Sequence, residues 1–146
     1  MKTFIKLALA ALAVTSCSSS EESINQLADR VFALAETQCT SMDAYLAPDT
    51  FPKNMGKDGQ LVTSDINWWC SGFFPGVLWM LSEDYPQDAQ LRQYAELYTR
   101  RVEPVRKVTD NHDIGFMLGC SYGHAYRITG DESYMTILSE GAHEAF

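Results

Sequence analysis

The chain has 146 residues, of which 46% are hydrophobic and 21% are charged, and this composition fits one globular domain. Its 9 Gly, 5 Pro and 4 Cys residues exclude the collagen-like, disordered and disulfide-scaffold classes. The net charge of −8 argues against a nucleic-acid-binding surface, because such a surface needs basic residues that displace counterions from phosphates.

The first residues have the features of an export signal. Lys2 and Lys6 form a basic start, and the apolar run from Leu7 to Val14 is far shorter than the ~20 residues of a membrane-spanning helix. The run ends in Val-Thr-Ser-Cys17, which resembles a bacterial lipoprotein signal whose cysteine is lipidated and becomes the mature N-terminus. The alternative is an ordinary cleaved secretory signal with an incidental cysteine.

The lipoprotein interpretation divides the chain into three parts. We predict a signal peptide at residues 1–16, a lipid-attached polar tether at 17–23 and a folded domain at 24–146. The protein would be exported and held by its lipid alone on a bacterial membrane, either on the periplasmic side or at the outer membrane and cell surface.

The first folded element expected is an amphipathic helix from Ile24 to Tyr45, where apolar residues recur every three or four positions. From Leu46 to Asn67 this periodicity vanishes, and prolines and glycines interrupt the run. We predict a loop there, and a loop of this length tends to be a functional lid or rim.

Four further helices are predicted, at residues 73–82, 87–105, 111–127 and 132–143. The helix at 73–82 is apolar on every side, so we expect it to be buried. Thr129-Gly130-Asp131 is expected to end one helix and cap the next.

The fold class that these elements predict is all-α, because no stretch alternates convincingly between apolar and polar residues. Successive helical hairpins fit a bundle, or part of a solenoid or toroid. The alternation of apolar with amphipathic helices favours the toroid, in which inner helices are covered on both sides and outer helices on one. Cys39, Cys70 and Cys120 lie in apolar stretches, where buried, unpaired thiols are expected.

Two segments carry candidate chemistry, Trp68–Gly76 and Asp110–Met117. Each places polar or aromatic groups just before an inner helix, and in a ring of helix pairs these helix ends point into the central cavity. Backbone N–H groups there favour anionic ligands, and tryptophan faces suit the C–H side of a sugar ring.

The first motif reads W-x-x-G-F-F-P-G-x-L-W from Trp69, and the second reads H-D-I-G-F-M from His112. Together they resemble glycoside hydrolase family 88, the unsaturated glucuronyl hydrolases. The resemblance implies an (α/α)6 toroid, of which this chain would be the N-terminal part. It also implies a lyase-generated, glycosaminoglycan-type oligosaccharide that ends in a 4,5-unsaturated uronic acid. Such enzymes hydrate the vinyl ether double bond without a metal or organic cofactor.

The same resemblance assigns roles to individual residues. Asp113 matches one of the family's two essential carboxylates, and Trp69 matches the aromatic residue that lines the subsite for the unsaturated sugar. His112 is a supporting candidate for substrate binding. The second carboxylate would lie beyond Phe146, so the chain by itself is expected to be inactive.

Simpler interpretations stand beside these assignments. Asp110 and Asp113 have the spacing of an N-cap and N3 pair, and a carboxylate in a first helical turn is stabilised as the anion. Trp69 can be a core residue, Trp79 is expected to be one, and Gly115, Gly119 and Gly123 suggest close helix packing. The three histidines show no metal-ligand spacing. The alternative function is a non-catalytic surface lipoprotein that binds a carbohydrate or a protein, and the oligomeric state is not predicted.

Overall fold

The computed structural model describes residues 22–144. The predicted signal peptide at 1–16 and the lipidation site Cys17 lie outside these residues, as does the beginning of the tether. Within residues 22–144, no helix is both long enough and apolar enough to cross a membrane.

Helix α1 spans Ile24–Met42 and continues into a 3-10 turn at Asp43–Tyr45, as the periodicity predicted. It begins with a capping box, in which the Ser23 hydroxyl accepts from the Gln26 backbone N–H and the Gln26 side chain accepts from that of Ser23. One face of α1, with Phe32, Ala35, Cys39 and Met42, packs against the core.

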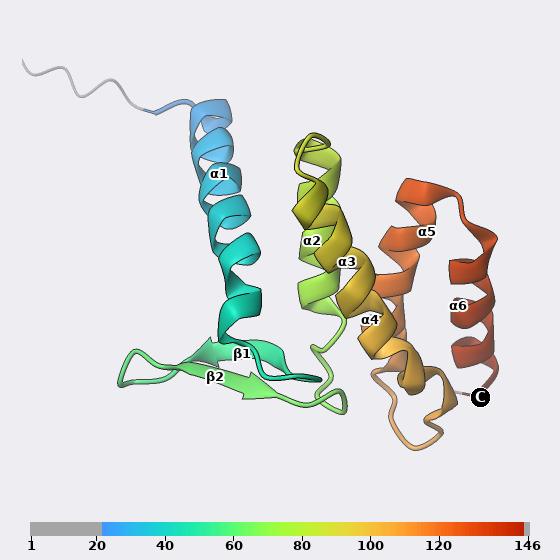
Figure 1. The fold of residues 1–146 in the computed structure, drawn as a ribbon. Coiled ribbons are helices and arrows are strands. Elements are labelled where there is room, and N and C mark those ends of the chain that lie inside the picture. The colour runs from blue at the N-terminus through green and yellow to red at the C-terminus, as the bar shows by residue number, and fades with distance from the viewer. Residues whose placement is uncertain (1–21, 145–146) are drawn as a thin grey trace, which may run out of the picture.

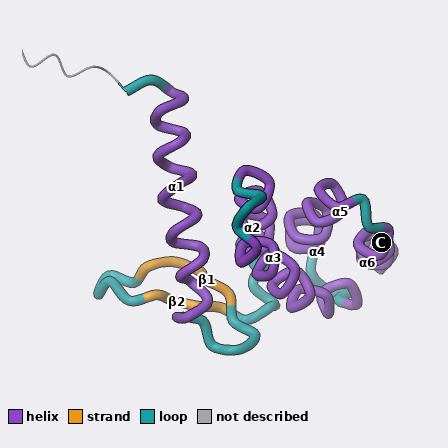
Figure 2. The backbone as a smooth tube through the Cα atoms, turned by 45° about the horizontal axis from the view of Figure 1, so that its top comes forward, coloured by secondary structure: helices purple, strands orange, loops and turns teal. Residues whose placement is uncertain are grey.

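A β-hairpin follows where a loop was predicted, so the prediction of a loop without strands is wrong, although the fold as a whole is mostly helical. Strand β1 (Phe51–Met55) pairs antiparallel with β2 (Leu61–Ser64), and Figure 2 shows the hairpin beside the C-terminal end of α1. Phe51 is buried and meets the Tyr98 ring edge-on at 6.0 Å between centroids, which fixes the hairpin to the helices.

The remaining elements are helical and run in alternating directions (Figure 1). The N-terminal ends of α2 and α4 lie at the same end of the molecule, and the hairpin lies at that end too. These elements are α2 (Phe73–Asp84), α3 (Ala89–Val102) with a 3-10 turn at Glu103–Lys107, α4 (Ile114–Leu118), a π-helical segment at Gly119–Gly123, α5 (His124–Thr129) and α6 (Glu132–Glu144).

The helix predicted at 111–127 begins three residues later than expected, at Ile114, and its middle is π-helical. The buried Ser121 hydroxyl donates to the Met117 carbonyl oxygen at 2.7 Å within this segment. The predicted stop is confirmed, because Gly130 adopts a left-handed φ of 68° and Asp131 accepts a hydrogen bond from the Ser133 N–H.

Trp79 lies in the core, as expected, and its indole N–H donates to the Thr99 hydroxyl at 2.8 Å. The expectation that α2 is buried on every side is wrong for one face. Phe73, Val77 and Met80 on α2 are each about two-fifths exposed among the described residues. Within residues 22–144, this face of α2 is therefore uncovered.

Close helix packing occurs, but not at the glycines that were expected to provide it. A Cβ on Gly115, Gly119 or Gly123 would meet nothing within 4 Å. A Cβ on Gly72 would overlap the Met117 carbonyl, and one on Gly76 would lie 2.6 Å from the Cys120 carbonyl oxygen. The start of α2 thus lies directly on the backbone of α4 and the π-helical segment.

The cysteines Cys39, Cys70 and Cys120 are free, as expected, although each is half-buried rather than fully buried. Burial raises the pKa of the Cys39 and Cys120 thiols above the ordinary value, which keeps both thiols protonated near neutral pH.

Candidate functional site

The two segments singled out in the sequence meet in the structure. The loop before α2 carries Trp68 and Trp69, and the loop before α4 carries His112 and Asp113. The contact of Gly72 with the Met117 backbone holds the two helix starts together, because any side chain at that position would push them apart. The motifs therefore build one surface.

Three aromatic side chains form the centre of this surface, and we call them the aromatic cluster: Trp69, Phe73 and Phe116. The Trp69 ring meets Phe73 edge-on at 5.6 Å and Phe116 edge-on at 6.3 Å between centroids. All three side chains are exposed, with Trp69 at 40% and Phe116 at 55%. Trp69 is therefore a surface residue and not the core residue that the simpler interpretation allowed.

Trp68 and Lys53 extend the aromatic cluster toward the hairpin. The Trp68 ring lies 6.2 Å from that of Trp69, and the Lys53 ammonium lies 3.6 Å from the centroid of the Trp68 ring. This distance is typical of a cation–π contact. The site thus combines exposed apolar rings with one cation at its edge.

Asp113 occupies the N-cap position of α4, but its side chain makes no capping hydrogen bond. The prediction of Asp110 as N-cap and Asp113 as N3 is wrong, because the helix begins at Ile114. The Asn111 side-chain oxygen instead accepts from the Asp113 backbone N–H at 2.9 Å. The Asp113 side chain is half-buried, at 23% exposed, and its carboxylate oxygens are not engaged in a capping hydrogen bond.

His112 is almost fully exposed, at 94%, and its Nε2 atom lies 3.6 Å from Oδ1 of Asp113. This separation is longer than a hydrogen bond but short enough for an ionic contact when the imidazole is protonated. His112 can therefore reach a ligand bound at Asp113, although packing does not hold its ring in place.

Cys70 follows Trp69 in the loop before α2. Burial raises the pKa of the Cys70 thiol, the negative charge of Asp113 raises it further, and the positive charge of Lys53 lowers it. The thiol therefore feels the charges of both Asp113 and Lys53.

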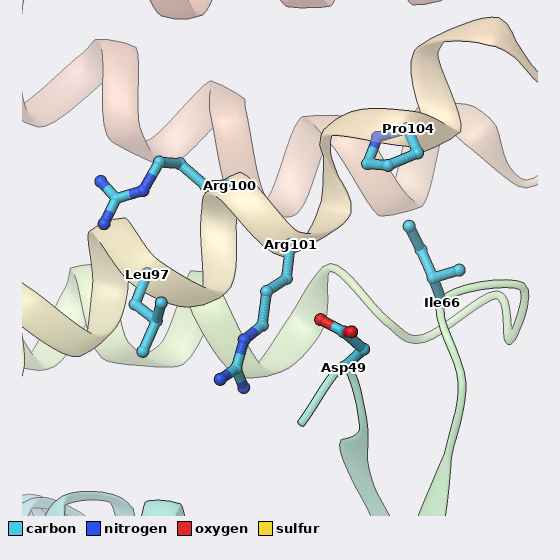
Figure 3. Close-up of a pocket in the computed structure, with 6 residues that line it drawn as sticks. All are labelled: Asp49, Ile66, Leu97, Arg100, Arg101 and Pro104. Carbon is cyan, nitrogen blue, oxygen red and sulfur yellow. The ribbon is translucent and has the colours of Figure 1, made fainter. Parts of the chain in front are cut away.

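A separate pocket lies between α3 and the loops that flank the hairpin (Figure 3). Its volume is about 440 Å³, and it contains none of the predicted site residues. The Arg101 guanidinium there lies 4.5 Å from the centre of the Tyr98 ring. The lining residues are Asp49, Ile66, Leu97, Arg100, Arg101 and Pro104.

No family model matches the chain. It is 33% identical over 89 residues to an unsaturated glucuronyl hydrolase of Formosa agariphila, across 61% of this chain and 20% of that protein. It is 34% identical over 93 residues to an unsaturated chondroitin disaccharide hydrolase of Streptococcus agalactiae, across 61% of this chain and 21% of that protein.

The comparison of folds also finds an unsaturated glucuronyl hydrolase. A crystal structure of an unsaturated glucuronyl hydrolase specific for heparin matches with a TM-score of 0.67 and 34% sequence identity, across 80% of this chain and 32% of that one. The findings support a partial member of glycoside hydrolase family 88. The helical hairpins of this chain match part of an α/α toroid, and the chain spans about a fifth of the length of the two curated relatives.

Sequence reasoning found Trp69, His112 and Asp113, and the structure brings the segments that carry them together. It missed Lys53, Phe73 and Phe116 as members of this surface. Phe73 and Phe116 both stand inside the two motifs, so their exposure was the missing information. Lys53 lies in the segment that was predicted to be a loop. Its contact with Trp68 becomes visible only once the segment is folded as a hairpin.

Among residues 22–144, no group of three or more His, Cys, Asp or Glu side chains is placed to hold a metal ion. The groups that the site does offer are exposed rings, a half-buried carboxylate and a lysine. Such a surface can stack a sugar ring and contact its charged substituents.

Proposed function

We propose that this chain is the N-terminal part of a hydrolase that releases a terminal 4,5-unsaturated uronic acid from lyase-generated, glycosaminoglycan-type oligosaccharides. One observation carries the proposal, namely that the exposed Trp69 and Phe116 rings pack edge-on while the half-buried Asp113 lies at the N-cap of the helix that carries Phe116. The printed names of the related proteins, unsaturated glucuronyl hydrolase and unsaturated chondroitin disaccharide hydrolase, support the substrate class.

The reaction adds water across the double bond of the unsaturated sugar. A proton is delivered to C4 and the oxygen of water bonds to C5, after which the hydrated product rearranges and the next sugar leaves. The aromatic cluster would hold the apolar face of the ring. Asp113, which makes no cap hydrogen bond, would act as a carboxylate that orients the water or accepts its proton.

We further propose that residues 1–146 bind the substrate without turning it over, since proton delivery to C4 is assigned to a second carboxylate outside them. The test is to incubate the chain with an unsaturated disaccharide and follow both binding, by calorimetry, and the ultraviolet absorbance of the double bond. Binding without loss of absorbance is expected. Loss of absorbance would contradict the inactivity, and absence of binding would contradict the proposed substrate.

Asp113→Asn gives a sharper test in a longer version of the protein that carries the further helix pairs. The substitution keeps the shape of the side chain and removes its charge, so we expect hydration to fall by at least about a hundredfold. Asp110→Asn is the matched control, because Asp110 is an exposed aspartate of the same loop. An unchanged rate in Asp113→Asn would remove Asp113 from the mechanism.

A second candidate is a surface lipoprotein that binds carbohydrate and does no chemistry. The exposure of the whole aromatic cluster favours it, because stacking on a sugar needs no carboxylate. The two functions differ in selectivity. A hydrolase-derived site should prefer the unsaturated uronate to its saturated counterpart, whereas a general sugar-binding surface should bind both equally.

We also propose that the protein is lipid-anchored through Cys17 after removal of residues 1–16, with the domain outside the cytoplasm. The sequence of the first residues supports this proposal. Mass spectrometry of the protein purified from its membrane fraction should show an acylated cysteine at the N-terminus, and Cys17→Ser should release the protein from that fraction. An unmodified N-terminus after cleavage would instead indicate an ordinary secretory signal.

A further inference from the structure

We propose that Lys53 binds an oxyanion of the oligosaccharide, a uronate carboxylate or a sulfate, at the hairpin edge of the aromatic cluster. This inference rests on the proposed function, because it assigns an additional binding residue to the same surface. It is carried by the geometry of the hairpin and the contact between Lys53 and Trp68.

The hairpin is irregular at Lys53. Pro52 pairs with Thr63 and Asn54 pairs with Val62, so Lys53 is an extra residue with no partner on β2. Such a bulge bends the strand and changes the direction of a side chain, and bulges are frequent beside functional sites. Both strands are short, and two strands of this length can pair regularly without a bulge.

The bulge coincides with a specific contact. The Lys53 ammonium lies 3.6 Å from the centre of the Trp68 ring, whose neighbour Trp69 belongs to the aromatic cluster. The ammonium has three N–H donors, and among residues 22–144 Lys53 forms no ion pair. Its position is thus held by an aromatic face while its donors stay available to a ligand.

The charge balance of the protein explains why an anion needs such a group. The chain carries a net charge of −8, and Asp113 adds a negative charge at the site itself. An oligosaccharide with carboxylates or sulfates would be repelled unless a local cation compensates. Lys53 supplies a cation at the hairpin edge of the aromatic cluster, where its ammonium contacts the Trp68 ring.

The alternative is that Lys53 only stabilises the hairpin by covering Trp68. Lys53→Met separates the two roles, because methionine keeps an apolar stem over the ring and removes the charge. Lys53→Arg keeps both the charge and the contact with the ring. Lys57→Met is the matched control, because Lys57 is the other lysine of the hairpin and lies in its turn, where no aromatic contact is found.

Binding is measured calorimetrically with the full chain and two probes, a non-sulfated unsaturated disaccharide and its sulfated counterpart. For Lys53→Met we expect binding of at least one probe to weaken about five- to tenfold at low salt, as for one partly exposed charge-assisted hydrogen bond. The loss should shrink as salt is added, since screening already weakens the wild-type contact. Lys53→Arg should bind like the wild type, and so should Lys57→Met.

The two probes identify the oxyanion. An equal loss with both assigns Lys53 to the uronate carboxylate, and a loss with the sulfated probe alone assigns it to a sulfate. If Lys53→Met binds both probes like the wild type while Trp69→Ala does not, the role of Lys53 is wrong and the proposed function stands. If the wild type binds neither probe, both proposals fall.

Discussion

The indole ring of Trp69 meets the phenyl ring of Phe116 edge-on, with 6.3 Å between their centroids, although the two residues belong to different helical hairpins. This contact joins the loop before α2 to the first turn of α4, the helix whose N-cap position Asp113 occupies. The position of the sugar platform is therefore tied to that of the carboxylate.

Trp69→Ala should weaken binding of the unsaturated disaccharide by roughly fivefold or more, because it removes the largest ring of the platform. The free energy of unfolding should change little, since the side chain is 40% exposed. Tyr45→Ala is the control, because Tyr45 is an exposed aromatic residue outside the site. Equal effects of both substitutions on binding would argue against Trp69 as a platform.

Gly72→Ala should lower the free energy of unfolding by about 1–3 kcal/mol, because the new methyl group would overlap the Met117 carbonyl. Gly115→Ala should leave it unchanged or raise it by about 0.5 kcal/mol, because nothing lies near that position and alanine favours the helix. Chemical denaturation measures both. A larger loss of stability for Gly115→Ala than for Gly72→Ala would mean that α2 and α4 do not approach each other as described.

Thr99→Val should lower the free energy of unfolding by about 1–3 kcal/mol, because it leaves the buried indole N–H of Trp79 without its acceptor. Thr136→Val is the matched control. The Thr136 hydroxyl donates to the Glu132 carbonyl on an exposed face of α6, where water replaces the lost bond. Thermal unfolding of the two variants should separate them clearly, and similar melting temperatures would contradict the burial of the Trp79–Thr99 pair.

Tyr98 should make the protein sensitive to alkaline pH. Burial and the hydrogen bond that its hydroxyl donates to Asp43 raise the pKa of Tyr98 from 10.0 to about 12. The folded state thus holds this proton more tightly than the unfolded state, so the stabilisation is present below pH 10 and is lost as the pH rises toward 12.

The measurement is the free energy of unfolding between pH 8 and 12 for the wild type and for Tyr98→Phe. The wild type should lose stability more steeply above pH 10, because the variant lacks one of the ionisations responsible. Tyr45→Phe should follow the wild type, since Tyr45 is mostly exposed. Parallel curves for Tyr98→Phe and the wild type would contradict the coupling between Tyr98 and Asp43.

Hydrophobic periodicity was sufficient to predict α1, α3 and α6, because each packs one stripe of apolar side chains against the core, fully buried in α3 and partly buried in α1 and α6. It could not predict the hairpin. The two strands are short, one contains Pro52, and Phe51 is the one residue of either strand that is fully buried, so no alternation was visible. The anchor of the hairpin is a long-range contact with Tyr98, which local pattern does not contain.

The spacing of glycines did not predict which helix face packs closely, for a similar reason. The pairs Gly72 and Gly76, and Gly115 and Gly119, both show the four-residue spacing of a close-packing face. The first pair lies against a neighbouring backbone and the second pair does not. Spacing indicates that helices can approach, but only the tertiary arrangement determines which of the two faces is used.

The predicted site residues were found through motifs, and the geometry changed their interpretation. Asp113 was expected within the first turn and lies at the N-cap position instead, where its carboxylate makes no capping hydrogen bond. The sequence signal for a bulged, ring-bound Lys53 is weak, since a lysine after a proline in an apparent loop is common. The contact with Trp68 gives that lysine a defined position.

The π-helical segment at Gly119–Gly123 sets the rotational phase of the helix that runs through α4 and α5. Successive side chains of an α-helix are about 100° apart around the helix axis. One extra residue in a turn therefore rotates the side chains that precede it by about 100° relative to those that follow it. Deleting one residue there would turn either Phe116 away from Trp69 or Ala125 out of the core. The insertion lets one helix present Phe116 to the site at its start and a buried core residue at its end.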